Sequence, residues 1–121
     1  MPRLSKSDLI RSCFATYKAK DRDAIDALLA DDFTFTSPYD DRIDKAEYFV
    51  RCWPNSERIG SHILERIFVE GDEAYVTYKC VMHDGREFRN TEFFRFSGDR
   101  VREINVYFGA TYQGGAFVKQ S

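Results

Sequence analysis

Residues 73–109, EAYVTYKCVMHDGREFRNTEFFRFSGDRVREINVYFG, decide the fold class that the sequence predicts. They contain three runs rich in β-branched and aromatic residues, at 73–83, 86–97 and 100–109. Asp84-Gly85 and Gly98-Asp99 separate the runs, and such pairs favour the tight turns of β-hairpins. Because short connections force neighbouring strands to run antiparallel, this segment predicts an antiparallel meander.

The chain before this meander predicts one more long strand and one short strand. Residues 61–70 form another β-rich run, which ends at the turn signal Gly71-Asp72. Residues 33–37, FTFTS, alternate apolar and polar side chains and stop at Pro38, as a short strand does. The character of the chain therefore changes from helix to strand after Gly60.

Three segments have the caps and the apolar spacing of helices. The first begins at a capping box over 5–8 and runs to a break at Lys20-Asp21. The second is short, and the third begins at a capping box over 44–47 and ends at Pro54. Their apolar stripes at the helical period are Leu9, Ile10, Cys13, Phe14 and Tyr17, then Ile25, Leu28 and Leu29, then Ala46, Phe49, Val50 and Trp53.

Helices packed on such a meander predict a single α+β domain over residues 1–121, with three helices on one face of the sheet. A sheet covered in this way twists strongly and curls around its helices. We therefore expect a cone-shaped, curved antiparallel sheet wrapped around three N-terminal helices, with an opening at one end.

The composition excludes several classes of protein. Of the 121 residues, 43% are hydrophobic and 31% charged, as in a soluble globular domain. The 18 Lys and Arg nearly balance the 20 Asp and Glu, so no strong field would attract nucleic acid or an anionic membrane. Aromatic residues reach 16%, which suits sheet faces and the walls of an apolar pocket.

Further features predict a cytoplasmic protein without a metal or a cofactor. The first residues, MPRLSKSDL, lack an apolar signal segment, and no apolar run approaches the roughly 18 residues of a membrane helix. Cys13, Cys52 and Cys80 are widely spaced, so we expect reduced thiols that pack as small hydrophobes. The two His and the scattered acids do not form a metal-binding set.

Glu92 is the residue that indicates a function most directly. By alternation, one face of the run 86–97 carries Phe88, Asn90, Glu92, Phe94 and Phe96. The more apolar face should meet the helices, and an ionised carboxylate is costly to bury there. Glu92 is then a pocket acid that moves a proton, or it bonds to Asn90, Tyr17 or an arginine and closes the core. A β-bulge would instead turn it to solvent.

The order of elements, the segment DFTFTSP at 32–38 and the segment RNTEFFRFSGDRVREINVYFG at 89–109 resemble the nuclear transport factor 2-like superfamily. Within it, the chain is similar over nearly its whole length to SnoaL-like and ketosteroid-isomerase-like domains. The resemblance implies a cone-shaped, cystatin-like α+β roll with a deep pocket, commonly assembled as a dimer through the outer sheet face. The superfamily contains isomerases, cyclases, dehydratases, epoxide hydrolases and non-catalytic domains, so the resemblance does not select an activity.

The resemblance to ketosteroid isomerases assigns roles to three positions. Those enzymes use a general-base Asp before a Pro, and an oxyanion hole made of a Tyr and a protonated Asp. Here Ser37 precedes Pro38, so that base is missing. Glu92 matches the protonated acid, and Tyr17 on the first helix matches the tyrosine.

Other positions bear on related activities. SnoaL-like cyclases depend on an acid near the end of the sheet, where this chain has Gly109, and the Asp-Arg-Asp arrangement of epoxide hydrolases is not assembled by the sequence. Asp40 or Asp41, in the loop after the proline, is an alternative base at the pocket mouth. His62 is either a further acid–base group, because its free pKa lies near neutrality, or a structural residue.

We therefore expect a pocket for a small apolar molecule, acting as a cofactor-independent isomerase, cyclase or hydrolase. A non-catalytic domain that binds a hydrophobic ligand is the alternative, and a protein-interaction module is the third possibility. The candidate catalytic residues are Glu92, Tyr17, His62 and Asp40. The residues expected to contact the ligand are Phe35, Ser37, Trp53, Tyr78, Phe88, Asn90, Phe94 and Phe108.

The outer sheet face predicts a homodimer. Tyr75, Phe93 and Tyr107 alternate onto this face among polar residues. An exposed aromatic patch on a small protein usually meets a partner, here a second copy of the chain.

Overall fold

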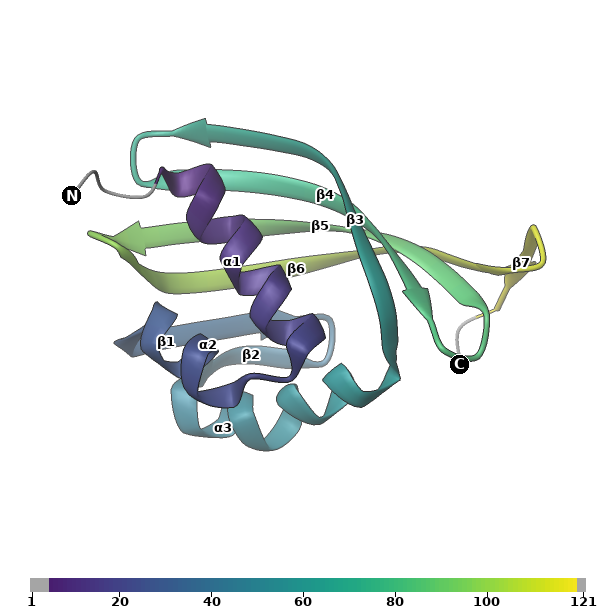
Figure 1. Ribbon diagram of the computed structural model, residues 1–121, viewed down its shortest axis with the longest axis horizontal. Coiled ribbons are helices and arrows are strands. Elements are labelled where there is room, and N and C mark those ends of the chain that lie inside the picture. Colours follow the sequence, from purple (N-terminus) through teal and green to yellow (C-terminus); the bar gives the residue numbers. More distant parts are fainter. Residues whose placement is uncertain (1–4, 120–121) are drawn as a thin grey trace.

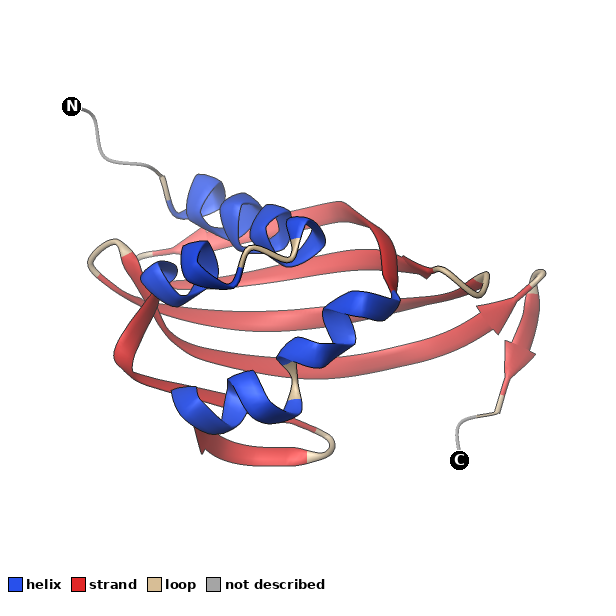
Figure 2. Ribbon diagram, turned by 60° about the horizontal axis from the view of Figure 1, so that its bottom comes forward, coloured by secondary structure: helices blue, strands red, loops and turns tan. Residues whose placement is uncertain are grey.

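The computed structural model describes residues 5–119, and its helices cover one face of a large curved sheet (Figure 1, Figure 2). The helices are α1 (Lys6–Ala19), α2 (Arg22–Leu28) and α3 (Lys45–Arg51), followed by the 3₁₀-helix η1 (Trp53–Arg58). At the start of α1 and of α3, the capping side chain accepts a hydrogen bond from the backbone N–H three residues on, as the predicted capping boxes require. Within residues 5–119, no helix combines the length and the apolarity needed to cross a membrane.

Six strands form the main path of the sheet in the order β2-β1-β6-β5-β4-β3, and the short strand β7 pairs with β6 outside this path. All neighbours are antiparallel except β1 and β6, which run parallel. The sheet is therefore mixed. β1 and β6 can run parallel because they are not joined by a hairpin, which would force them to run in opposite directions. The strands are β1 (Leu29–Ser37), β2 (Asp40–Asp44), β3 (Ile59–Glu70), β4 (Glu73–Met82), β5 (Arg86–Ser97), β6 (Arg100–Gln113) and β7 (Ala116–Val118).

The third helix is shorter than predicted, and it buries a different face. It ends at Arg51, so that Trp53 begins η1 instead of closing the helix. Val50, expected in the apolar stripe, is 68% exposed, whereas Tyr48 is buried. The cause is the contact with β1, where the Tyr48 ring packs against Phe33 and Phe35 with centroids 5.3 and 5.2 Å apart.

The ends of two predicted segments also differ. Residues 40–44 form β2 rather than a loop, because their backbone pairs with β1 although their side chains, DDRID, lack apolar alternation. The final long strand continues past the predicted end at Gly109 to Gln113, and Gly114-Gly115 then turns the chain into β7.

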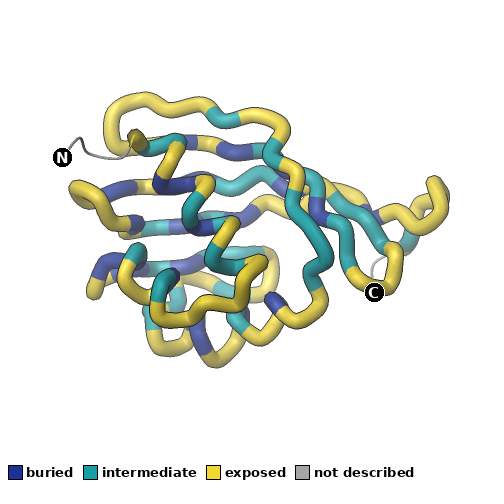
Figure 3. Tube along the Cα trace, in the orientation of Figure 1, coloured by how far each residue is buried: buried dark blue, intermediate teal, exposed yellow. Residues whose placement is uncertain are grey.

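The buried core lies between the helices and the sheet face that they cover (Figure 3). The α1 residues Leu9 and Ile10 meet sheet residues such as Phe33, Val76 and Phe94 in one apolar cluster. All three cysteines are free and buried, as the sequence predicted. The core therefore follows the alternation and the helical periods in the sequence.

One of the three rings expected to be exposed on the outer face of the sheet is buried. Tyr75 and Tyr107 are 50% and 56% exposed, but Phe93 is only 7% exposed. Its ring is covered by Tyr75, with centroids 5.2 Å apart, and by the Arg95 guanidinium 5.6 Å from the ring centre. Cross-strand packing on a twisted sheet thus buries an outward-facing residue within its own chain.

Gly109 is required by a close approach of β6 to β5. A Cβ atom at this position would lie 2.2 Å from the Arg89 carbonyl oxygen, which is backbone and cannot move aside. The approach coincides with a register shift of the β5–β6 pairing between Phe88 and Asn90. The acid that a cyclase-like site would place at 109 therefore has no room here.

We expect the substitution Gly109→Ala to lower the free energy of unfolding by about 1–3 kcal/mol, because the added methyl forces the two strands apart. Urea denaturation followed by circular dichroism measures the change. The control is Ala110→Ser at the next, exposed position, which should shift the free energy by less than about 0.5 kcal/mol. Equal stability of Gly109→Ala and the wild type would contradict the close approach.

Candidate functional site

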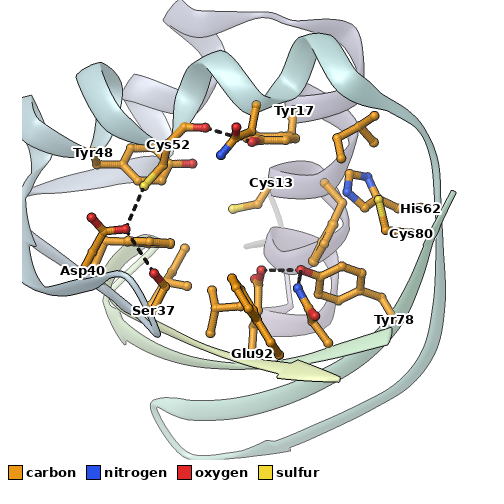
Figure 4. Close-up of a pocket in the computed structure, with 18 of the residues that line it drawn as sticks. Cys13, Tyr17, Ser37, Asp40, Tyr48, Cys52, His62, Tyr78, Cys80 and Glu92 are labelled. Atoms are coloured by element: carbon orange, nitrogen blue, oxygen red, sulfur yellow. Dashed lines mark hydrogen bonds between the residues drawn. The ribbon is translucent and has the colours of Figure 1, made fainter. Parts of the chain in front are cut away.

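A cavity of about 380 Å³ lies between the helices and the inner face of the sheet (Figure 4). Side chains from all three α-helices, from η1 and from strands β1 to β6 line it. Its wall is mostly apolar, with aromatic rings and thiols separating a small number of polar groups. Such a lining is typical of sites for small organic ligands.

The cavity collects all the residues expected to be catalytic or to contact the ligand, with the exception of Trp53. The Trp53 ring packs edge-on against Tyr17 and Phe49, with centroids 5.3 and 6.0 Å apart, and does not reach the lining. Whether the lining residues contact a ligand stays a prediction. They include Tyr17, Phe35, Ser37, Asp40, His62, Tyr78, Phe88, Asn90, Glu92, Phe94 and Phe108.

Glu92 lines the cavity from β5 and ends a chain of hydrogen bonds. Tyr78 Oη donates to Glu92 Oε1 at 2.8 Å, and Asn90 Nδ2 donates to Tyr78 Oη at 3.1 Å. Burial raises the pKa of Glu92 to about 7, although the Tyr78 hydrogen bond favours the carboxylate and opposes this shift. Among the described residues, no Lys or Arg forms an ion pair with Glu92. Glu92 is thus an acid that holds its proton almost to neutral pH.

The partner of Glu92 is Tyr78, which the sequence analysis expected to contact the ligand but did not pair with Glu92. The sequence did contain the information needed to pair the two residues, because the hairpin turn Asp84-Gly85 sets the register of β4 and β5. This register places Tyr78 opposite Asn90 and Val76 opposite Glu92. Tyr78 and Glu92 are therefore diagonal neighbours on the inner face, within reach of long side chains.

Tyr17 lies across the cavity from Glu92 (Figure 4). Its hydroxyl donates to the Cys52 carbonyl oxygen at 3.1 Å, so it ties α1 to the end of α3. Burial raises the pKa of Tyr17 above its ordinary value, and the hydroxyl stays protonated. The hydroxyl adjacent to Glu92 is that of Tyr78, and Tyr17 occupies a separate part of the wall.

Asp40 and its partners form a second polar group in the wall. Ser37 Oγ donates to Asp40 Oδ2 at 3.0 Å, and Cys52 Sγ lies 3.7 Å from the same oxygen. Arg51 Nη2 lies 2.9 Å from Oδ1, in an ion pair whose angle is not that of a hydrogen bond, and the Asp40 side chain is 7% exposed. Asp40 is therefore a buried, cation-paired carboxylate of β2 and not an acid of a solvated loop. Asp41 is exposed and lies outside the lining.

His62 lines the cavity as a neutral imidazole. Its ring contacts Phe14, Tyr17 and Tyr78, with centroids 5.0, 6.0 and 5.6 Å apart. Burial and, secondarily, the positive charge of Lys18 lower the pKa of His62 to about 4. Its buried Nδ1 has no hydrogen-bond partner within residues 5–119. At neutral pH His62 is therefore uncharged and cannot donate a proton as an imidazolium.

The three thiols that line the cavity behave as apolar groups. Burial raises the pKa of Cys13, Cys52 and Cys80 to about 12, and neighbouring acids add to the shift at Cys13 and Cys52. Such thiols are poor nucleophiles, because the reactive species is the thiolate. In the part of the chain that the structure describes, no cluster of three or more His, Cys, Asp or Glu is arranged to hold a metal ion.

Comparisons with known proteins identify the family. The family model of the SnoaL-like domain matches residues 10–104, most of the chain, and the chain belongs to this family. No curated protein matches it.

Several solved structures share the fold. A provisionally named ketosteroid isomerase from Kribbella flavida superposes with a TM-score of 0.74 at 19% identity, covering 88% of this chain and 78% of that one. A provisionally named polyketide cyclase from Sinorhizobium meliloti gives 0.68 at 20% identity, with coverages of 82% and 93%. An epoxide hydrolase of the LEH-like type from M. tuberculosis gives 0.68 at 19% identity, with coverages of 84% and 80%. The predicted superfamily is thereby confirmed at the level of fold.

The pKa of Glu92 makes a prediction about stability. Its folded-state pKa of about 7 lies above the ordinary value of 4.5, so the folded protein binds the proton more tightly than the unfolded chain. The resulting stability is fully present below about pH 4.5 and is lost as the pH rises through about 7. We expect the free energy of unfolding of the wild type, relative to Glu92→Gln, to fall by about 2–3 kcal/mol across this range.

Urea denaturation at a series of pH values measures this difference. Taking the difference between the two proteins cancels the titration of His62, which is present in both. Glu70→Gln, a charge-removing change at the exposed end of β3, serves as the control. A pH-independent difference between the wild type and Glu92→Gln would show that Glu92 has an ordinary pKa.

Proposed function

We propose that this member of the SnoaL-like family binds a small, largely apolar molecule in the cavity and transfers a proton to or from it. The observation that carries the proposal is a carboxyl group with a pKa of about 7, set in an apolar wall. Perturbed acids in cavities are a feature of sites that transfer protons. The reaction class would be isomerisation, cyclisation or hydrolysis, which are the activities of the enzymes that share this fold.

Glu92 would act on an oxygen atom of the substrate. As a neutral acid, it donates a hydrogen bond to a carbonyl, ether or epoxide oxygen, and this bond strengthens as negative charge develops there. The apolar surroundings increase the effect, because no bulk water competes for the charge. With a pKa of about 7, the group can also give up the proton in the physiological range.

Asp40 would be the complementary base. It is the other carboxyl group of the lining, and the Arg51 guanidinium compensates its charge. Two carboxyl groups in contrasting environments are the usual basis for dividing acid and base roles within one site. Asp40 lies three residues beyond Ser37, so a carboxylate of the β1–β2 hairpin takes the place of the missing base.

A non-catalytic ligand-binding domain is the second candidate. Both oxygens of Asp40 are engaged, Oδ2 by Ser37 and Cys52 and Oδ1 by Arg51. A base held in this way would have to exchange one of these contacts for the substrate proton. The observation favours binding without turnover and calls for an experiment that measures both.

The probe 2-acetylnaphthalene tests the proposal, because it combines an apolar body, a carbonyl acceptor and exchangeable methyl protons. We expect the wild type to bind it about 3–10-fold more tightly than 2-isopropylnaphthalene, which lacks the acceptor, as the net value of one hydrogen bond suggests. Isothermal titration calorimetry measures the affinities. Glu92→Leu should abolish the preference, Glu92→Gln should keep part of it through its N–H donor, and the surface control Glu70→Gln should keep all of it.

Exchange of the acetyl methyl protons in D₂O, followed by NMR, separates the two candidate functions. Catalysed exchange that is lost in Glu92→Gln and Asp40→Asn, with binding retained, supports the enzyme. Tight binding without exchange in the wild type supports the ligand-binding domain. Equal affinity for the ketone and the hydrocarbon would refute the role of Glu92 in both.

We also propose that the chain forms a homodimer through the outer sheet face. The exposed rings Phe68, Tyr75 and Tyr107 would supply the contact, since apolar surface of this kind is usually covered by a partner. Sedimentation velocity should find a dimer at micromolar concentration and a monomer for the double variant Tyr75→Glu with Tyr107→Glu. Val50→Glu, at an exposed position of α3, should remain dimeric. A monomeric wild type would overturn the proposal.

A further inference from the structure

The hydrogen bonds behind Glu92 begin at a backbone amide of β6. Gly109 N–H donates to Asn90 Oδ1 over a long 3.4 Å, Asn90 Nδ2 donates to Tyr78 Oη at 3.1 Å, and Tyr78 Oη donates to Glu92 Oε1 at 2.8 Å. This series of hydrogen bonds thus runs from β6 to β5, from β5 to β4, and back to β5. Asn90 is 7% exposed and Tyr78 is 5% exposed, so neither exchanges these bonds freely with water.

The backbone amide sets the orientation of the Asn90 side chain, from which the hydrogen bonds to Tyr78 and Glu92 continue. An amide N–H only donates, so Asn90 must present Oδ1 to Gly109 and Nδ2 to Tyr78. If the Asn90 side chain were flipped, two donors would face each other and the Gly109 N–H would lose this partner. Tyr78 Oη receives the Asn90 proton, and its own hydrogen points to Glu92 Oε1.

The direction of these hydrogen bonds determines which oxygen of neutral Glu92 carries the proton. Oε1 accepts from Tyr78 and is the carbonyl oxygen of the protonated group. The acidic hydrogen is therefore on Oε2, free of the hydrogen-bond chain. In the reverse direction, Glu92 would donate to Tyr78 and present only an acceptor to a ligand.

We propose that Asn90, oriented by the Gly109 backbone amide, is a positioning residue that holds Tyr78 as a donor and thereby directs the Glu92 proton into the cavity. The inference rests on the proposed role of Glu92 as a proton donor. Asn90 acts through Tyr78 and need not touch the ligand. The proposal also gives the tight β5–β6 contact at Gly109 a role in the site.

Glu92 is the group among its close titratable neighbours that changes charge near neutral pH. Burial raises the pKa of each neighbouring thiol and phenol above its ordinary range, so these groups stay neutral. His62 is neutral above about pH 4, and the cation-paired Asp40 lies on another wall. The neighbours that interact electrostatically with Glu92 are Cys13 and Tyr17 from α1, Tyr48 from α3 and Tyr78 from β4.

Infrared spectroscopy of the protonated carboxyl group tests the direction without a ligand. At about pH 5.5, Glu92 is protonated while ordinary carboxyl groups are mostly ionised. The difference spectrum against Glu92→Gln assigns its C=O stretching band. A carbonyl that accepts a hydrogen bond absorbs at lower wavenumber, so Tyr78→Phe should shift the band upward.

Asn90→Leu isolates the effect of the positioning residue, because it removes the donor to Tyr78 without adding a charge. We expect its band to move toward that of Tyr78→Phe, and the double variant to coincide with Tyr78→Phe alone. This non-additivity is the signature of action through a shared partner. Thr91→Val, a matched change at the next residue, whose hydroxyl bonds to Thr77, should leave the band in place.

Each other outcome overturns the proposal. An unchanged band in Asn90→Leu means that Asn90 does not set the direction, and equal shifts with and without Tyr78 mean that it does not act through the phenol. If Asn90→Leu fails to fold, the smaller change Asn90→Ala removes the same donor and should give the same upward shift, and an unshifted band in Tyr78→Phe shows that Tyr78 is not the donor. Naphthyl ketone binding is measured separately, so the proposed function can fail while the band shifts as expected, and the reverse.

Discussion

The removal of one carboxyl group from water is the physical constraint on which the site depends. Glu92 stands on an apolar strand face, and burial there favours the neutral acid over the carboxylate. The surrounding structure does not relieve this cost with a cation. It supplies a phenol hydrogen bond instead, which offsets part of the cost and leaves the pKa near 7. A site with an arginine at that point would hold a permanent carboxylate and would have no proton to donate.

The two buried carboxyl groups of the cavity have different neighbours. Asp40 is paired with Arg51 and accepts a hydrogen bond from the Ser37 hydroxyl. Glu92 accepts a hydrogen bond from Tyr78 and has no ion pair within residues 5–119, and it loses its charge as the pH falls. The two carboxyl groups of one cavity therefore differ in the neighbours that each strand brings to them.

The shared fold does not by itself select a reaction, because relatives at 19–20% identity carry the names of an isomerase, a cyclase and a hydrolase. Two local features of this chain bear on the reaction. Ser37 stands before Pro38, and a bare glycine at 109 brings β6 against the Arg89 carbonyl. The first removes the base expected from ketosteroid isomerases, and the second excludes an acid at the end of the sheet. The carboxyl groups that line the cavity are those of Asp40 and Glu92.

The sequence by itself determined where the first and third helices begin, the β4–β6 meander and the inward face that carries Glu92, because these follow from caps, turns and a side-chain period of two. It also contained the β4–β5 register that places Tyr78 beside Glu92. Only the tertiary structure decided that Tyr17 bonds to Cys52 and that Asp40 is buried against Arg51. Those outcomes depend on contacts between segments far apart in the chain, and no local pattern encodes the distance at which such segments meet.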